Sequence, residues 1–166
     1  MSESIRFVII TGLSGAGKSE VIKCFEDFGY FCVDNLPPAL IPKFAELCAQ
    51  SDGSINKIAL VVDLRSGNFF DDIYEALESL EQTGFSYEIL FLEAREEILI
   101  RRFKESRRPH PLSVNGGISE GIRAEQTRLE QIRGKATMIV DTSELTAKGL
   151  RELISKNYDQ SSPQEK

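Results

Sequence analysis

The most informative stretch of the 166-residue chain is Gly12-Leu13-Ser14-Gly15-Ala16-Gly17-Lys18-Ser19. It matches GxxxxGK followed by Ser, the P-loop pattern, in which a glycine-rich turn points backbone N–H groups at phosphate. A largely apolar run at residues 5–10 precedes it, and residues 20–28 after it have helical periodicity. A strand, a turn and a helix whose positive end faces the turn are the context that the motif requires. We therefore predict a phosphate site for a nucleotide, rather than a glycine-rich turn that contains Lys and Ser by chance.

Two side chains of the motif have expected roles. Lys18 is expected to reach the β- and γ-phosphates, where its charge makes it a predicted catalytic residue. The Ser19 hydroxyl is expected to take a Mg²⁺ position.

The composition indicates one soluble globular domain, with 41% hydrophobic and 28% charged residues. The formal net charge of −6 means that any contact with nucleic acid needs a local basic patch. Cys24, Cys32 and Cys48 form no CxxC pair, so neither a disulfide framework nor a zinc site is indicated. We see no signal peptide and no stretch of membrane-spanning length, and we therefore expect a cytoplasmic protein with no membrane partner.

Strand-like and helix-like segments alternate along the chain. The predicted strands are residues 5–10, 30–33, 58–64, 87–92 and 138–140. Five βα units predict a three-layer α/β sandwich with a five-stranded parallel sheet. We place one domain at residues 1–158 and expect the polar, proline-containing residues 159–166 to be disordered.

Acidic residues stand at the carboxyl ends of four of the predicted strands, at Asp34, Asp63, Glu93 and Asp141. Ligands of open parallel sheets bind beyond the carboxyl ends of the strands. Asp63 closes an apolar strand in the Walker-B form, so we predict that it is catalytic and holds Mg²⁺ with Ser19, the alternative being a loop cap. Four roles stay open for Asp34. It could be a second metal partner, a base or a substrate ligand, or it could form an Asx turn before two prolines.

A basic cluster leads into residues 107–121, whose prolines and glycines predict a long surface loop. The cluster comprises Arg101, Arg102, Lys104, Arg107 and Arg108. One interpretation is a lid whose catalytic arginines, Arg107 or Arg108, close over the transferred phosphate. The others are a contact for an RNA backbone and a solvated helix face, because glutamates interleave with the basic residues.

Five motifs together resemble one family, the RapZ-type nucleotide-binding proteins, bacterial P-loop ATPase/GTPases also called RNase adapter proteins. The motifs are GLSGAGKS at 12–19, DNLP at 34–37, DLRS at 63–66, RRPHPL at 107–112 and VDTS at 140–143. The resemblance implies a P-loop-kinase-like core and weak hydrolysis of ATP and GTP. It implies ATP binding by Gly12, Leu13, Ser14, Gly15, Ala16, Gly17, Lys18 and Ser19, and GTP binding by Asp63, Leu64, Arg65 and Ser66.

The resemblance also implies partners. Enteric members bind small regulatory RNA and control amino-sugar synthesis, and the family carries a second, C-terminal domain. Because this sequence ends at Lys166, we expect the N-terminal domain only, with RNA or an RNase bound through the full-length protein. A homo-oligomer stays open.

The expected function is therefore a nucleotide-binding regulatory protein that binds and slowly hydrolyses ATP and GTP with Mg²⁺. Two alternatives remain. The first is a small-molecule kinase with Asp34 as base. The second is an RNA-binding adapter in which the nucleotide is only a conformational ligand.

Overall fold

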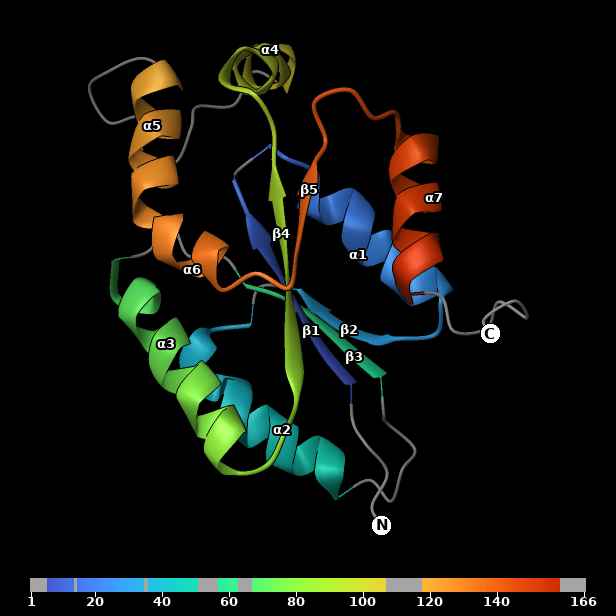
Figure 1. The fold of residues 1–166 in the computed structure, drawn as a ribbon, viewed down its shortest axis with the longest axis vertical. Coiled ribbons are helices and arrows are strands. Elements are labelled where there is room, and N and C mark those ends of the chain that lie inside the picture. The colour runs from blue at the N-terminus through green and yellow to red at the C-terminus, as the bar shows by residue number, and fades with distance from the viewer. Residues whose placement is uncertain are drawn as a thin grey trace.

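The five predicted strands form one parallel sheet in the order β2-β3-β1-β4-β5 (Figure 1). This is seen in a computed structural model, which describes residues 6–13, 15–34, 36–50, 57–62, 67–106 and 118–158. The strands are β1 Arg6–Gly12, β2 Phe31–Asp34, β3 Lys57–Val61, β4 Tyr87–Glu93 and β5 Met138–Asp141. β1 is the central strand, and its residues from Phe7 to Ile10 are fully buried because helices cover both faces of a parallel sheet.

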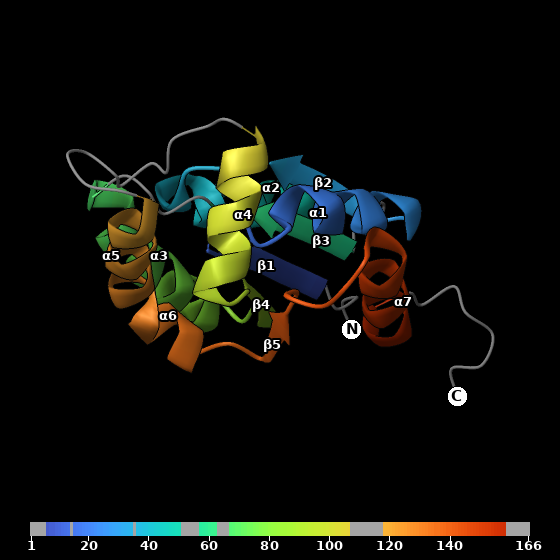
Figure 2. The same cartoon turned by 90° about the horizontal axis from the view of Figure 1, so that it is seen from above.

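Helices lie on both faces, so the predicted three-layer α/β sandwich is confirmed (Figures 1 and 2). They are α1 Lys18–Asp27, the 3₁₀ turn η1 Pro38–Leu40, α2 Ile41–Ala49, α3 Gly67–Gln82, α4 Glu96–Ser106, α5 Ile118–Arg128, α6 Glu130–Gly134 and α7 Ala147–Tyr158. α1 and α7 pack side by side on one face, and α2, α3, α5 and α6 lie on the other. α4 crosses above the carboxyl ends of the strands (Figure 2).

Several predicted boundaries were wrong. β3 ends at Val61 rather than at residue 64. α5 begins at Ile118, so the last four residues of the predicted loop 107–121 are helical. Gly121 is buried in that helix, where packing outweighs the low helix propensity of glycine. Residues 107–117 and the predicted tail 159–166 lie outside the described residues.

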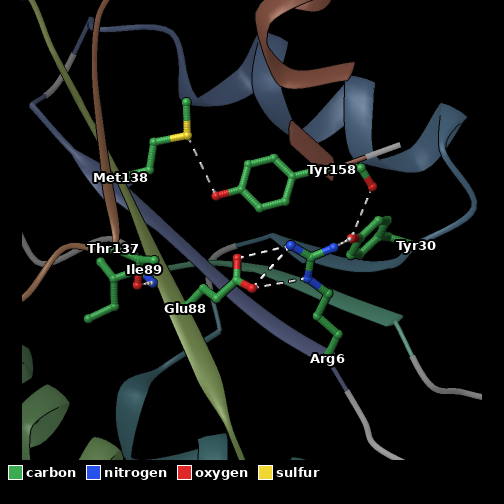
Figure 3. Close-up of polar contacts among 7 residues, drawn as sticks. All are labelled: Arg6, Tyr30, Glu88, Ile89, Thr137, Met138 and Tyr158. Atoms are coloured by element: carbon green, nitrogen blue, oxygen red, sulfur yellow. Dashed lines mark hydrogen bonds and ion pairs between the residues drawn. The ribbon is translucent and has the colours of Figure 1, made fainter. Parts of the chain in front are cut away.

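A polar cluster ties the end of α7 to the amino ends of the strands (Figure 3). The Arg6 guanidinium donates to both carboxylate oxygens of Glu88, at 3.1 and 3.2 Å, and to the Tyr30 hydroxyl at 3.2 Å. The Tyr30 hydroxyl donates to the Tyr158 carbonyl at 3.3 Å, and the Arg6 guanidinium lies 5.0 Å from the centre of the Tyr158 ring. Burial, with Glu88 nearby, raises the pKa of Tyr158 to about 12. The cluster fixes the last helix at the end of the sheet opposite the P-loop.

Within the part of the chain that the structure describes, no helix is both long enough and apolar enough to cross a membrane.

Candidate functional site at the P-loop

The P-loop connects β1 to α1, and the first glycine of the motif brings it close to β4. Gly12 has φ 144°, and a Cβ built on it would lie 2.2 Å from the Leu92 carbonyl oxygen. The next residue donates to the same oxygen, because the Leu13 N–H lies 3.0 Å from it. Only glycine permits this approach, so β1 and β4 together set where the turn begins.

The loop ends at the amino terminus of α1. Gly17 is the N-cap, with φ 115°, and a glycine brings no side-chain oxygen of its own to the first turn. The Lys18 ammonium donates to the carbonyls of Gly12 and Leu13, both at 3.0 Å, so it lies across the loop. Ser19 follows in the first turn, with an exposed side chain. A positive helix end, a lysine and an exposed serine are thus brought to the same turn, which is the setting that phosphate and Mg²⁺ binding require.

Two residues from distant parts of the chain hold the carbonyl groups of the loop. Arg102, from α4, donates to the Gly15 carbonyl at 2.9 Å, and to the Thr142 carbonyl and hydroxyl at 2.9 and 3.2 Å. The buried Thr142 hydroxyl donates in turn to the Ala16 carbonyl at 2.7 Å. Burial, with Arg101 nearby, lowers the pKa of Arg102. These bonds hold two carbonyl groups of the loop in place, so we name Arg102 and Thr142 the P-loop brace.

Two of the acidic residues at strand ends are engaged within the protein. The Glu93 carboxylate accepts two hydrogen bonds from Arg133, at 2.7 and 3.0 Å. The Asp141 carboxylate accepts from the Ser143 N–H at 2.9 Å, and hydrogen bonding to Ser143 lowers the pKa of Asp141. Asp34 is the last residue of β2, rather than part of the following loop, and it is exposed. No group of three or more metal-ligating His, Cys, Asp or Glu side chains occurs among the described residues.

Some predicted site residues lie outside the described ranges. These are Ser14, Asp63, Leu64, Arg65, Ser66, Arg107 and Arg108. The strand before Asp63 is nevertheless well placed, because the Val62 N–H donates to the Ile10 carbonyl at 3.0 Å. The described chain therefore reaches Val62 beside Ile10 of β1, two residues before the P-loop begins.

The structure brings seven predicted residues together in one turn and helix start: Gly12, Leu13, Gly15, Ala16, Gly17, Lys18 and Ser19. Sequence reasoning missed the brace. Its signals were present, since Thr142 follows a strand and Arg102 belongs to the basic cluster, but nothing in the sequence joins them.

Comparisons with known proteins agree with this architecture. The model of the RapZ-like N-terminal domain matches residues 5–162. A nucleotide-binding protein of Clostridium kluyveri is 58% identical over 156 residues, which cover 94% of this chain and 53% of that protein. One of Clostridium botulinum is 58% identical over 154 residues, covering 93% and 52%. The chain thus spans about half the length of the curated relatives it matches.

Solved structures show the same fold. A shikimate kinase from Bacteroides thetaiotaomicron superposes with a TM-score of 0.56 at 18% identity, covering 92% of this chain and 97% of that one. A gluconokinase from Sinorhizobium meliloti gives 0.54 at 20% identity, covering 93% and 92%. At such identities the likeness concerns the fold alone, which is that of P-loop kinases. The family match over residues 5–162 confirms the resemblance expected from the five motifs, and the chain belongs to the RapZ-like N-terminal domain family.

Proposed function

We propose that this domain binds ATP and GTP with Mg²⁺ at the P-loop and hydrolyses them slowly, in a regulatory role. The observation that carries the proposal is the Lys18 ammonium, which lies across the loop at 3.0 Å from two of its carbonyls, at the positive end of α1. The name of the curated relatives, nucleotide-binding protein, supports the nucleotide-binding part of the proposal.

The proposed roles follow from this geometry. Lys18 binds the phosphates and stabilises the charge that develops during transfer. Mg²⁺, when bound, neutralises phosphate oxygens, and hard oxygen ligands such as the exposed Ser19 hydroxyl and the Asp63 carboxylate suit it. Arg102 and Thr142 hold the carbonyls of Gly15 and Ala16, so that these do not turn toward the anion. The loop is then preorganised for phosphate before the nucleotide arrives.

The guanine contact proposed at Asp63, Leu64, Arg65 and Ser66 rests on the family resemblance. Competition between ATP and GTP for one site, measured by displacement of a fluorescent nucleotide, tests it. Mutually exclusive binding supports a shared pocket, and independent binding assigns the two nucleotides to separate sites.

Replacing Asp63 with asparagine tests the metal site. Asparagine keeps the shape of the side chain but loses its charge, so the gain in ATP affinity on adding Mg²⁺ should fall about tenfold. Calorimetric titrations with and without Mg²⁺ measure this gain. Asp34→Asn, at the end of β2, is the matched control and should keep the wild-type ratio. If the gain in ATP affinity on adding Mg²⁺ is unchanged in Asp63→Asn and falls in Asp34→Asn, the metal role belongs to Asp34.

The two arginines after α4 are proposed to act as a lid over the γ-phosphate. Their support is the preceding helix, which contacts the P-loop through Arg102. Replacing both Arg107 and Arg108 with alanine should lower turnover about 100-fold, while nucleotide affinity changes by less than about threefold, because a lid arginine acts mainly on the transition state. Phosphate-release kinetics and equilibrium binding separate the two effects.

The matched control replaces Arg101 and Lys104 of α4, both exposed, with alanine. This variant loses the same amount of charge and should keep the wild-type turnover. Normal hydrolysis by the Arg107/Arg108 variant would contradict the lid. The two arginines would then be tested as an RNA contact, by salt-dependent retention of RNA.

A small-molecule kinase is the second candidate. It is favoured by Asp34, which stands exposed at the carboxyl end of β2, on the same edge of the sheet as the P-loop. Transfer of labelled phosphate from ATP to a metabolite extract, lost in Asp34→Asn, would support it. The RNA adapter gains no such support from the described part of α4, where the exposed Arg101 and Lys104 alternate with the exposed Glu97 and Glu105.

A further inference from the structure

A cavity of about 360 Å³ lies beside the P-loop, between the carboxyl end of β4 and the helices α5 and α6. Its apolar part is formed by Leu13, Phe91 and Ala94. Phe91 and Glu93 both line it, because side chains two apart on a strand share a face, and this is the face that α5 and α6 cover. Its volume is at the lower end of the roughly 300–1,000 Å³ usual for ligand pockets.

The opposite wall is polar. Gln126, Thr127, Glu130 and Arg133 line it, at a spacing that places them on one side of the α5–α6 segment. Leu129 and Ile132, which lie between Thr127 and Arg133 in the sequence, are buried and belong to the core. Four polar side chains therefore lie opposite Phe91, Glu93 and Ala94 across a space large enough for a small molecule.

The charges of this cavity do not favour an anionic ligand. Its one cation among the lining residues is Arg133, and two hydrogen bonds of 2.7 and 3.0 Å commit that guanidinium to Glu93. Glu130 then leaves the wall with a net negative charge. A phosphate or carboxylate would meet this charge with no uncommitted cation among the described lining residues to offset it. Because Glu130 is exposed and screened by water, its attraction for a cation is weak as well.

The hydrogen-bonding groups suit hydroxyls. The Thr127 hydroxyl donates to the Arg123 carbonyl at 3.1 Å, which leaves its oxygen able to accept. Gln126 offers both an amide donor and a carbonyl acceptor. A ligand hydroxyl both donates and accepts, and the ring or chain carbons between hydroxyls can lie on Leu13 and Phe91. We propose that this cavity is a second binding site, which takes a small, uncharged, hydroxyl-rich molecule of the polyol or sugar class.

The proposal goes beyond nucleotide binding and does not depend on it. Leu13 belongs to both sites, since its side chain lines the cavity while its carbonyl accepts from Lys18. The cavity itself, however, is built by β4, α5 and α6, and its polar wall includes no P-loop residue. Binding should therefore persist in a Lys18→Ala variant that no longer binds ATP, which keeps the two proposals separable.

The test uses two matched pairs of probes, glucose with glucose 6-phosphate and myo-inositol with myo-inositol 1-phosphate. Each is titrated into the nucleotide-free protein while ¹H–¹⁵N NMR spectra are recorded. At least one uncharged probe should saturate with a dissociation constant of about 1 mM, shifting the signals of residues 126–133 and Leu13. Its phosphorylated partner should bind about tenfold more weakly.

Matched variants locate the site. Gln126→Leu and Thr127→Val should each weaken binding of the uncharged probe about tenfold, the loss expected for one hydrogen bond. Gln131→Leu, an exposed glutamine of α6 that does not line the cavity, should bind like the wild type. Unchanged spectra away from the substitution show that each variant is folded. The proposal is overturned if neither uncharged probe saturates, if a phosphorylated probe binds as tightly, or if Gln131→Leu weakens binding as much as Gln126→Leu.

Discussion

Replacing Lys18 with alanine should lower nucleotide hydrolysis by at least about 100-fold and leave the fold intact, because the loss is that of a preorganised charge at the phosphates. The Lys18 ammonium donates to two loop carbonyls, those of Gly12 and Leu13, at 3.0 Å each, and its side chain is half-buried at the edge of the sheet. Hydrolysis is followed by phosphate release, and stability by thermal unfolding.

The control for Lys18 is Lys23→Ala, which removes the same charge from an exposed position on the same helix. It should hydrolyse and unfold like the wild type. If Lys18→Ala instead lost thermal stability in proportion to its activity, Lys18 would be a structural residue and the proposed chemistry would lose its main support.

Among the described glycines, Gly12 is the one whose replacement by alanine should lower the stability of the fold most. The new Cβ would lie 2.2 Å from the Leu92 oxygen, 2.7 Å from its nitrogen and 2.9 Å from its carbonyl carbon. All three are backbone atoms of a strand that pairs on both sides, with β1 and β5, so they cannot move aside. With the cost of a positive φ added, we expect the free energy of unfolding to fall by about 3–5 kcal/mol.

Urea unfolding measures this change, and Gly134→Ala is its control. Gly134 is also in the described part of the chain, at the end of α6, where a Cβ would meet nothing within 4 Å. Alanine there should leave the stability unchanged or raise it, by at most about 1 kcal/mol. A loss of less than about 1 kcal/mol in Gly12→Ala would mean that β4 can yield, and that the close approach of the strands is not required.

Local patterns predicted the elements around the P-loop well. The apolar run of β1, the glycines and the stripe of Val21, Ile22 and Phe25 all act over a few residues, so the strand, turn and helix could be read in order. Alternation of apolar runs and helical segments predicted the parallel sheet for the same reason.

Contacts between distant segments could not be predicted in this way. Arg102 is 87 residues from the Gly15 carbonyl that it holds, and Thr142 is 126 residues from Ala16. Glu93 stood at a strand end like a candidate ligand, yet its partner is Arg133, 40 residues later. The start of α5 was missed because the burial of Gly121 depends on tertiary packing, which periodicity does not report.

The brace also bears on the order in which the site can form during folding. Leu92, Arg102 and Thr142 all follow the P-loop by many residues. The Leu13 N–H donates to the Leu92 carbonyl, and Arg102 and Thr142 donate to the carbonyls of Gly15 and Ala16. During synthesis, the complete P-loop motif would thus leave the ribosome long before the residues that fix the conformation of the loop. Contacts of such long sequence separation form late and slowly. Nucleotide affinity is then a property gained only when β5 has joined the sheet, and bound nucleotide would in turn stabilise the finished domain by mass action.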